Sequence, residues 1–319
     1  MKLQQLRYVL EVARHNLNIS EVAEALFTSQ PGVSKQIRLL EDELGVSIFI
    51  RNGKRIVAIS EPGQAVLRFA EQIMRNVRNI REISDDFARM NSGDLTVATS
   101  HTQARYMLPD TIASFTKLFP DVRLIIKQGS PDEVSDLALQ GNVDFSIVTE
   151  CLQDSRELAL LPCYQWNRSV IVPRDHPILR IDRPLRLADL AVYPLVTYEF
   201  AFTPCSKIYK AFSEEGLQPT VALSAVDSDV IKTYVRLGLG VGLIETMAYQ
   251  ALPDADLVCL DVGHLFEKST AHIVIRRDSY LRGYAYQFIA LFAPELTREK
   301  IEDVLYTPPE PYYVEDFII

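Results

Sequence analysis

Residues 18–43, NISEVAEALFTSQPGVSKQIRLLEDE, predict two short helices joined by a tight turn. Asn18 can cap the first helix. Thr28 or Ser29 can cap the second helix, and Pro31 falls in its first turn, where a missing backbone N–H leaves nothing unsatisfied. Behind the cap, apolar residues at helical spacing predict the buried face of the second helix. This stripe comprises Val33, Ile37, Leu40 and Leu44.

The opposite face of the second helix is polar and predicts a surface that enters the DNA major groove. Amide and hydroxyl groups can hydrogen-bond to base edges, while lysine and arginine can reach guanine or phosphate. An ordinary helical hairpin with a solvated polar face is the alternative, because charged faces are usually only hydrated. The residues expected to contact DNA from this motif are Thr28, Ser29, Gln30, Pro31, Ser34, Lys35, Gln36 and Arg38.

The residues that follow predict a β-wing beside this helix-turn-helix. Residues 45–50 leave the helix, residues 51–55 form a basic turn, and residues 56–59 return as a strand. Cationic side chains at such a tip suit the phosphate backbone. The predicted DNA contacts therefore include three wing residues, Arg51, Lys54 and Arg55.

Together these features resemble the DNA-binding domain of LysR-type transcriptional regulators. The resemblance is carried by Leu3–Val12, the SQPGVSKQIRLLEDELG run (29–45), the basic wing and Ser60–Gly63. It implies a DNA-binding transcriptional regulator whose partner is double-stranded promoter DNA. It also implies a homo-oligomer, dimeric or a dimer of dimers that makes a homotetramer, with RNA polymerase as a further candidate partner.

The composition supports a multidomain chain with one DNA-binding end. With 319 residues, 48% of them hydrophobic, the chain can form more than one well-packed domain. The first 60 residues hold eight Lys/Arg against six Asp/Glu, a net charge of +2. Since the whole chain carries −9, the remaining residues carry −11. A mildly basic head on an acidic body fits a protein that touches DNA with one end.

Neither a membrane segment nor a metal site is predicted. No apolar run reaches spanning length, and the N-terminal segment is amphipathic rather than a signal peptide, so we expect a cytoplasmic protein without a membrane partner. The four cysteines lie outside any CxxC pair and away from any histidine at metal-ligand spacing. They predict buried thiols in a reducing compartment, with a redox switch as the less favoured alternative. They are Cys151, Cys163, Cys205 and Cys259.

Residues 64–90 contain no Pro or Gly and predict one long helix. A long helix with a narrow apolar stripe needs a partner of the same kind, so we infer a coiled-coil dimer, as the LysR resemblance also implies. Packing on its own domain is the alternative. The predicted stripe comprises Val66, Phe69, Ile73, Val77, Ile80, Ile83 and Phe87.

From residue 94 onward, short strands and helices alternate. Strands at 95–99, 122–128 and 143–149 enclose helices at 103–118 and 131–140, an order that predicts a parallel sheet covered on both faces. A second α/β series follows, and a strand at 270–275 with a helix at 284–292 should return to the first lobe. Two crossings predict a hinged two-lobed domain of the periplasmic-binding-protein type, with its ligand at the carboxyl ends of strands.

The fold class is therefore an α+β multidomain chain: a winged helix-turn-helix, a linker helix and a two-lobed α/β effector domain. The expected boundaries are 1–60 for the DNA-binding domain, 61–91 for the linker and 92–319 for the effector domain. Within the last, lobe I is expected at 92–164 and 269–300, lobe II at 165–268 and a tail at 301–319. The Pro-rich end, from Tyr306, is expected to be disordered or to dock on a neighbouring subunit.

The candidate ligand site begins where the first strand of the effector domain ends. Residues 99–103, TSHTQ, bring hydroxyls to the free N–H groups of a helix start, which suits an anion, although simple helix capping is the alternative. Glu150 follows the third strand at the same edge. Trp166 lies at the crossing between lobes, and Thr203 follows a second-lobe strand.

Four further segments resemble the CysB branch of the LysR family, which controls sulfur assimilation genes. They are SHTQARYMLP (100–109), QGSPDEV (128–134), LPCYQWNR (161–168) and DVIKTYVRLGLGVGLI (229–244). The resemblance implies a small-molecule effector, sulfate, O-acetylserine or N-acetylserine, rather than a cofactor. A LysR-type regulator tuned to another small anion is the alternative within the class.

The CysB resemblance also implies the effector-binding residues. The anion is expected on Ser100, Thr102, Gln103, Thr149 and Thr203, with Glu150 and Trp166 lining the same site. Glu150 would suit an ammonium group of the ligand. Two departures from the branch are Ser100, where threonine is usual, and Pro204-Cys205, where Gly-Arg is expected.

An enzyme with an appended DNA-binding head is the alternative from a different class. The chain has no P-loop, HExxH or GxSxG motif, and the glycines at 238–242 follow a predicted helix, so they do not form a dinucleotide loop. His101 beside Glu150 is the one candidate acid–base pair. No catalytic residue is therefore assigned.

Overall fold

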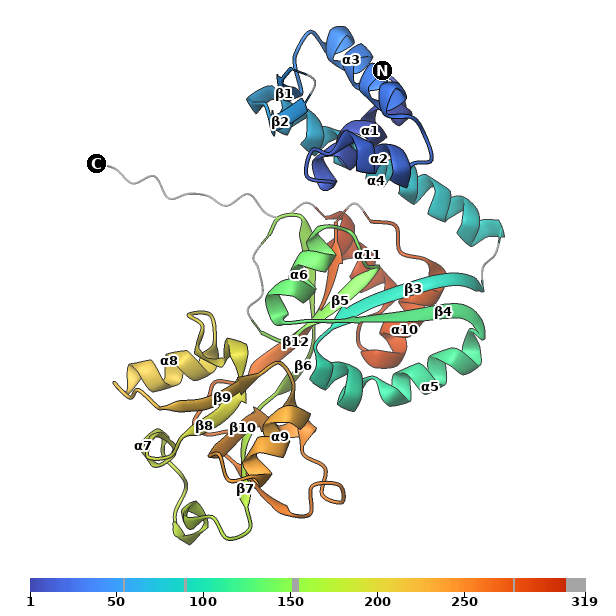
Figure 1. The fold of residues 1–319 in the computed structure, drawn as a ribbon. Coiled ribbons are helices and arrows are strands. Elements are labelled where there is room, and N and C mark those ends of the chain that lie inside the picture. The colour runs from blue at the N-terminus through green and yellow to red at the C-terminus, as the bar shows by residue number, and fades with distance from the viewer. Residues whose placement is uncertain (54, 89–90, 151–154, 278, 308–319) are drawn as a thin grey trace, which may run out of the picture. The chain divides into compact units, whose positions relative to one another are not determined.

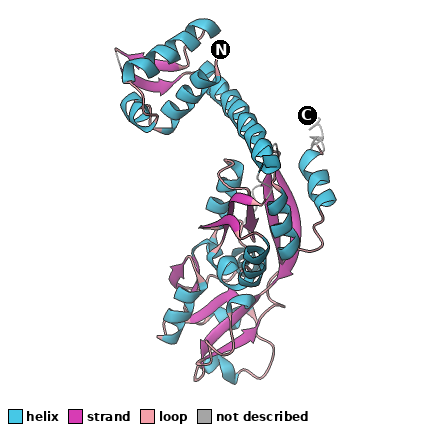
Figure 2. Ribbon diagram, turned by 90° about the vertical axis from the view of Figure 1, so that its right-hand side faces the viewer, coloured by secondary structure: helices cyan, strands magenta, loops and turns pink. Residues whose placement is uncertain are grey.

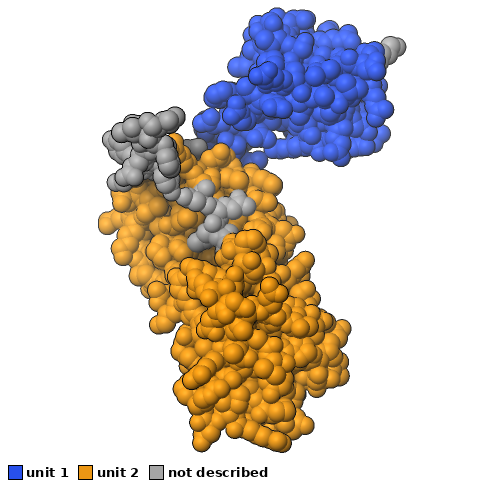
Figure 3. Space-filling view, turned by 90° about the vertical axis from the view of Figure 1, so that its left-hand side faces the viewer, with its two compact units in different colours: residues 1–85 blue, residues 86–319 orange. Residues whose placement is uncertain are grey.

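The computed structural model describes all residues except 54, 89–90, 151–154, 278 and 308–319, with only the backbone described for 85–88. The chain divides into two compact units, Met1–Asp85 and Asp86–Ile319 (Figure 3). None of the described helices is long and apolar enough to cross a membrane.

The first unit contains the predicted winged helix-turn-helix (Figure 1). Asn18 caps the second helix, since its side chain accepts from the N–H groups of Ser20 and Glu21. Of the two candidate caps for the third helix, Ser29 does so by accepting from Gly32. The elements are α1 (Leu3–Arg14), α2 (Ile19–Ala25), α3 (Gln30–Leu44) and the antiparallel wing strands β1 (Phe49–Asn52) and β2 (Arg55–Ile59).

One member of the predicted stripe on α3 lies outside the core. Val33, Ile37 and Leu40 are fully buried, whereas Leu44 is 39% exposed. The prediction for Leu44 is wrong because α3 ends there: Gly45 takes φ +70° and turns the chain away.

The linker helix α4 (Glu61–Ala88) is one continuous helix in Figure 2. It begins three residues earlier than predicted, since the Ser60 hydroxyl accepts from the N–H of Gly63. Its first turns pack into the core of the first unit through Leu67 and Ala70. Two residues of the predicted stripe, Val66 and Ile73, are partly buried against the same core, so the start of the stripe packs on its own domain. Phe69 and Ile80 are 65% and 67% exposed and remain open to a partner helix, and Phe87 lies outside the described side chains.

Lobe I of the second unit contains a five-stranded sheet of order β4-β3-β5-β12-β6. The first three strands are parallel, as predicted, and β12 returns from the far end of the chain, antiparallel to both neighbours. The strand β6 was not predicted. The strands are β3 (Ser92–Thr99), β4 (Asp121–Gln128), β5 (Phe145–Val148), β6 (Leu158–Trp166) and β12 (Ser269–Arg276).

Helices cover both faces of this sheet. Phe115 and Phe288 join one core cluster, while Val134 and Ala138 join a second. The helix predicted at 103–118 is interrupted: a π-helical turn, η1 (Gln103–Met107), precedes Pro109, where α5 begins. The helices are α5 (Pro109–Leu118), α6 (Pro131–Leu139), α10 (Gly283–Phe292) and α11 (Arg298–Tyr306).

Lobe II contains a second five-stranded sheet of order β11-β7-β10-β8-β9. Gly238 follows α9 with φ +77° and leads into β10, which is the predicted helix end and not a dinucleotide loop. The strand β11 was not predicted. The strands are β7 (Arg168–Pro173), β8 (Leu195–Tyr198), β9 (Val221–Ala225), β10 (Val241–Glu245) and β11 (Leu257–Asp261). The helical segments are η2 (Pro177–Arg180), α7 (Leu187–Ala191), η3 (Glu199–Phe202), α8 (Lys207–Glu214), α9 (Ser228–Arg236) and η4 (Thr246–Ala248).

The expected tail begins too early. Residues 301–306 lie in α11, where Ile301 and Leu305 are buried in the core of lobe I. The apolar spacing within IEDVLY, four residues between Ile301 and Leu305, is helical and accounts for the difference. Most of the Pro-rich end lies outside the described residues.

Replacing Ile301 with alanine tests this assignment. Because the side chain is fully buried, we expect the free energy of unfolding of the second unit to fall by about 2–5 kcal/mol. Urea unfolding followed by tryptophan fluorescence reports on this unit, which holds the single tryptophan, Trp166. Tyr306→Ala is the control, since that side chain is 60% exposed. Equal midpoints for the two variants would contradict the assignment.

Candidate nucleic-acid interface and effector site

The predicted DNA-contacting residues of the helix-turn-helix lie on one accessible face. Gln30, Lys35 and Arg38 are exposed, while Ser34 and Gln36 are half-buried. The remaining members, Thr28, Ser29 and Pro31, are also exposed. These side chains lie opposite the buried stripe of α3, where a helix that enters the major groove would present them.

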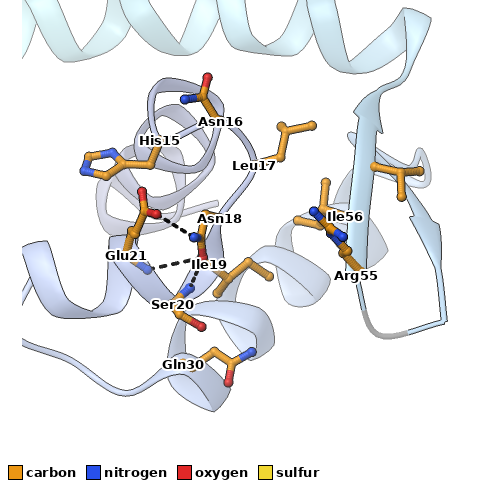
Figure 4. A pocket seen from close by; sticks show the side chains of 11 residues that line it. His15, Asn16, Leu17, Asn18, Ile19, Ser20, Glu21, Gln30, Arg55 and Ile56 are labelled. Carbon is orange, nitrogen blue, oxygen red and sulfur yellow. Dashed lines mark hydrogen bonds between the residues drawn. The ribbon is translucent and has the colours of Figure 1, made fainter.

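A pocket of about 650 Å³ brings the start of α3 and the wing together (Figure 4). Gln30 and Arg55 line it from α3 and β2, and Asn18, Ser20 and Glu21 line it from the start of α2. Two predicted DNA contacts, one on each element, therefore share a polar hollow. The tip residue Lys54 lies outside the described residues.

The wing is anchored to α3 by a buried carboxylate, that of Glu41. Its Oε1 accepts from the backbone N–H groups of Ile48 (2.8 Å) and Phe49 (3.1 Å). Its Oε2 pairs with the Arg51 guanidinium at 2.7 Å. The charge of Arg51 is thereby neutralised within the protein, so Arg51 holds the wing, and the exposed Arg55 is the better placed cation for phosphate.

The effector-domain residues 99–103 lie at the carboxyl end of β3, beside that of β5. The Thr99 hydroxyl donates to the carbonyl of Ile147 at 3.2 Å and ties the two strands together. Thr102 is buried near the start of η1, and Thr149 is buried just after β5. Ser100 is half-buried, and its hydroxyl accepts weakly from the N–H of Gln103 at 3.4 Å. The structure thus brings the predicted lobe I residues to one edge of the sheet.

The Gln103 side chain is already used within the protein. Its Oε1 accepts from the Tyr164 hydroxyl, and its Nε2 lies 3.4 Å from the Met247 sulfur. The residue is fully buried. A role in positioning η1 and Tyr164 fits this geometry better than direct anion contact by the amide.

The Glu150 carboxylate pairs with a protein cation, so the expected role opposite a ligand ammonium group needs correction. Its Oε1 forms an ion pair with Arg168 and accepts from the Ser269 hydroxyl at 2.9 Å. Burial lowers the pKa of Arg168 to about 10, against the opposing influence of the Glu245 carboxyl, so the guanidinium stays charged at neutral pH. The Trp166 ring lies 4.8 Å from this guanidinium in a cation–π contact.

Thr203 uses its hydroxyl locally. It donates to the carbonyl of Phe200 at 2.8 Å and lies 3.2 Å from the Cys205 sulfur. Cys205 is exposed and disulfide-bonded, so the expectation of buried thiols is wrong there, because the residue sits in the open turn after η3. Cys163 and Cys259 are half-buried free thiols, and Cys151 lies outside the described residues. Burial raises the pKa of Cys163 to about 12.

His101 does not meet Glu150, so the one candidate acid–base pair is not assembled. Its ring nitrogens lie 3.3 Å from Gln128 Oε1 and 3.3 Å from Asp229 Oδ2. Asp229 also accepts from Tyr106 at 2.7 Å, and Lys232 donates to the same Tyr106 hydroxyl at 2.8 Å. This network bridges the two lobes.

The bridging network also contains a weak candidate for a cation site. Ligand atoms of His101, Asp227 and Asp229 lie within 4.8 Å of one another. Arg105 and Lys232 already neutralise Asp229, at 2.7 and 3.1 Å. We therefore assign these groups to lobe contact.

Glu245, at the end of β10, is a buried acid that the sequence did not single out. It is 2% exposed and faces Arg168 of β7 in the strand register. Its backbone N–H donates to the Tyr198 hydroxyl at 3.3 Å. Burial raises the pKa of Glu245 to about 7, although Arg168 and the Thr102 hydroxyl oppose the shift.

Comparison with known proteins decides the family. Residues 3–64 match the bacterial regulatory helix-turn-helix of the LysR family, and residues 88–297 match the LysR substrate binding domain. The chain belongs to the LysR family of transcriptional regulators. The predicted resemblance, the α+β multidomain fold and the role as a DNA-binding transcriptional regulator are thereby confirmed.

Several relatives of this LysR-type regulator share nearly its whole length. The chain is 48% identical to the HTH-type transcriptional regulator SsuR of Burkholderia cenocepacia, over 96% of this chain and 99% of that protein. It is 48% identical to the HTH-type transcriptional regulator CysB of Haemophilus influenzae, over 95% and 93% of the two chains. The cofactor-binding domain of the Cbl transcriptional regulator is similar in structure, with TM-score 0.63 and 42% identity over 68% of this chain and 95% of that domain.

Two side chains of this LysR-type regulator were missed by sequence reasoning, although each carried a signal. Glu41 falls four residues after Ile37, at the border of the apolar stripe, where a solvated acid would not be expected. Glu245 ends the buried strand VGLIE, the same position relative to a strand that drew attention to Glu150. An acid at the edge of a buried pattern is therefore the signal to follow.

Glu41→Ala tests the wing anchor in this LysR-type regulator. Loss of the carboxylate leaves two buried N–H groups unsatisfied, so we expect the first unit to lose about 2–4 kcal/mol of unfolding free energy. Far-UV circular dichroism reports helices of both units, while Trp166 fluorescence reports only the second, so a transition that moves in the first signal and not in the second belongs to the first unit. Asp42→Ala, an exposed neighbour on α3, is the control. An unfolding curve of Glu41→Ala that coincides with the control would remove the anchor role.

Proposed function

We propose that this LysR-type regulator controls sulfur assimilation genes in response to a small acid of the sulfate or acetylserine class. The observation that carries the proposal is the buried edge where β3 and β5 end. There, Thr102 and Thr149 are buried at the ends of neighbouring strands, and Arg168 is already paired with Glu150. Uncharged donors at a helix start suit an anion held with modest affinity, which fits a metabolite sensor. Similarity to CysB and SsuR supports the assignment to sulfur metabolism.

DNA binding is proposed to use the exposed face of α3 and the wing in a homo-oligomer. The exposed apolar side chains of α4, Phe69, Ile80 and Ile83, support pairing of two linker helices. Pairing would place two recognition helices on one duplex, and a dimer of dimers would extend the contact. Promoter DNA is therefore the expected partner.

Gln30→Ala and Arg38→Ala test the DNA contacts. Each removes a groove-facing side chain, so we expect a loss of about 1–3 kcal/mol of promoter binding, measured by band-shift titration. Lys117→Ala removes an exposed cation of α5 in the second unit and serves as the charge-matched control for Arg38→Ala. Effector affinity should be unchanged in all three. Wild-type promoter affinity in both groove variants would show that α3 does not enter the groove.

A ligand panel scored by thermal shift on the full chain tests the effector class. A ligand at 100 times its dissociation constant adds about 2.7 kcal/mol to the native state, so sulfate, O-acetylserine or N-acetylserine should raise the melting temperature. Thr102→Val and Thr149→Val should reduce the shift. Thr116→Val is the control, because it removes an exposed hydroxyl of α5 that donates only to backbone carbonyls of its own helix. An unchanged melting temperature with all three ligands would favour a regulator that senses another small anion.

A further inference from the structure

We propose that Glu245 is a specificity-determining residue of the effector site, which makes the site prefer a small organic acid that carries an N–H donor over a bare inorganic oxyanion. The inference rests on the proposed effector site and names the class of ligand that the site selects. It adds a lobe II residue to a set of predicted contacts that lies mainly in lobe I.

The position of Glu245 places its carboxyl beside the predicted anion contacts. It ends β10, next to Arg168 of β7, and the Thr102 hydroxyl of lobe I interacts with it. Thr203, the one lobe II residue predicted from the sequence to contact the anion, has its hydroxyl bonded to Phe200. Glu245 and the Tyr198 hydroxyl are therefore the lobe II groups beside Thr102, and Glu245 is the only acid of the two.

Three residues that neighbour Arg168 each have a buried polar atom without a hydrogen-bond partner among the described residues. Glu245 Oε2 and Glu150 Oε2 are acceptors without a donor, and Trp166 Nε1 is a donor without an acceptor. Buried groups of this kind are rare, because each unmade bond costs about 1–3 kcal/mol. A ligand with an acidic group and an N–H group offers both missing partners. A bare oxyanion offers acceptors only, so it leaves the Glu245 oxygen without a donor.

The charges of the buried residues also favour an organic acid with an N–H donor over sulfate. With Glu245 ionised, one buried cation, Arg168, faces two buried carboxylates, Glu150 and Glu245. A sulfate dianion beside Thr102 would enter a region of net negative charge, and like charges repel strongly where little water is present. Protonation of Glu245 would remove the repulsion and supply a donor, so sulfate should bind together with a proton.

Three titratable neighbours of Glu245, namely Arg168, Tyr198 and Tyr164, each keep one charge state near neutral pH. Arg168 on β7 has a pKa of about 10 and stays charged. Burial raises the pKa of Tyr198 on β8 and of Tyr164 on β6, so both phenols stay neutral. Thr102, at the start of η1, does not ionise. The pKa of Glu245, about 7, therefore sets the pH at which sulfate binding changes.

Isothermal titration of the full chain with sulfate and N-acetylserine at pH 6, 7 and 8, at constant ionic strength, tests the proposal. In the wild type, sulfate affinity should fall about tenfold for each pH unit above the pKa of Glu245, since one proton is taken up on binding. N-acetylserine affinity should change much less. In Glu245→Gln, sulfate affinity should be independent of pH and about tenfold higher than wild type at pH 8, while N-acetylserine binding weakens. Glu199→Gln, an exposed acid on the same lobe, should behave as the wild type.

The outcomes separate this inference from the proposed function. If both ligands bind and the wild-type sulfate affinity is the same at pH 6 and pH 8, the role of Glu245 is wrong while the effector class stands. The same holds if Glu245→Gln keeps the wild-type pH dependence. If neither ligand binds the wild type at any pH, the proposed effector class is wrong, and so is this inference. The pH series on the wild type tests the proposal by itself, so the test remains decisive even if Glu245→Gln fails to fold.

Discussion

The Arg168 guanidinium is a charge with almost no access to water, and both crossings between the lobes meet it. Arg168 opens β7 as the chain enters lobe II, and Ser269 opens β12 as the chain returns to lobe I. The Ser269 hydroxyl lies 3.5 Å from the guanidinium and donates to Glu150, which pairs with the same cation. Removing one partner of such a buried pair costs about 3–5 kcal/mol, because a bare charge remains. The hinge is thereby tied to the end of β5, where Glu150 lies.

In the DNA-binding domain, one buried carboxylate likewise holds together elements that would otherwise be loosely attached. A two-stranded ribbon is marginal by itself in water, so β1 and β2 need an attachment to hold a fixed position. Glu41 provides it by accepting from two wing N–H groups and from Arg51. The recognition helix and the wing therefore move as one piece, and the hollow that Gln30 and Arg55 share keeps its shape. Specific groove contacts depend on that rigidity, since misplacement of either element would separate base and phosphate contacts.

Sequence reasoning succeeded where local chemistry decides and failed where tertiary packing decides. The caps at Asn18 and Ser29 and the turn after Gly238 follow from residue type, and the sequence predicted them. Leu44, in contrast, fits the helical period, but its helix ends before it can reach the core. The strands β6 and β11 carry no alternating pattern strong enough to read, and they are stabilised by pairing with distant partners. The partners of Glu150 could not be predicted either, because Arg168 lies on the strand that enters lobe II and Ser269 on the strand that returns from it.

A ligand that regulates the protein must do more than bind: it must favour one arrangement of the two lobes over another. A ligand shifts an equilibrium between lobe arrangements only by its difference in affinity for them, so contacts within lobe I alone change nothing. Ser100, Thr102 and Thr149 all belong to lobe I. The protein's own bridge, in which Asp229 and Lys232 of lobe II meet Tyr106 of lobe I, already favours contact between the lobes. A ligand can add to that bias only through lobe II groups such as Arg168 and Glu245. The residues that determine which acid is sensed are therefore expected among the same few side chains that couple binding to lobe closure.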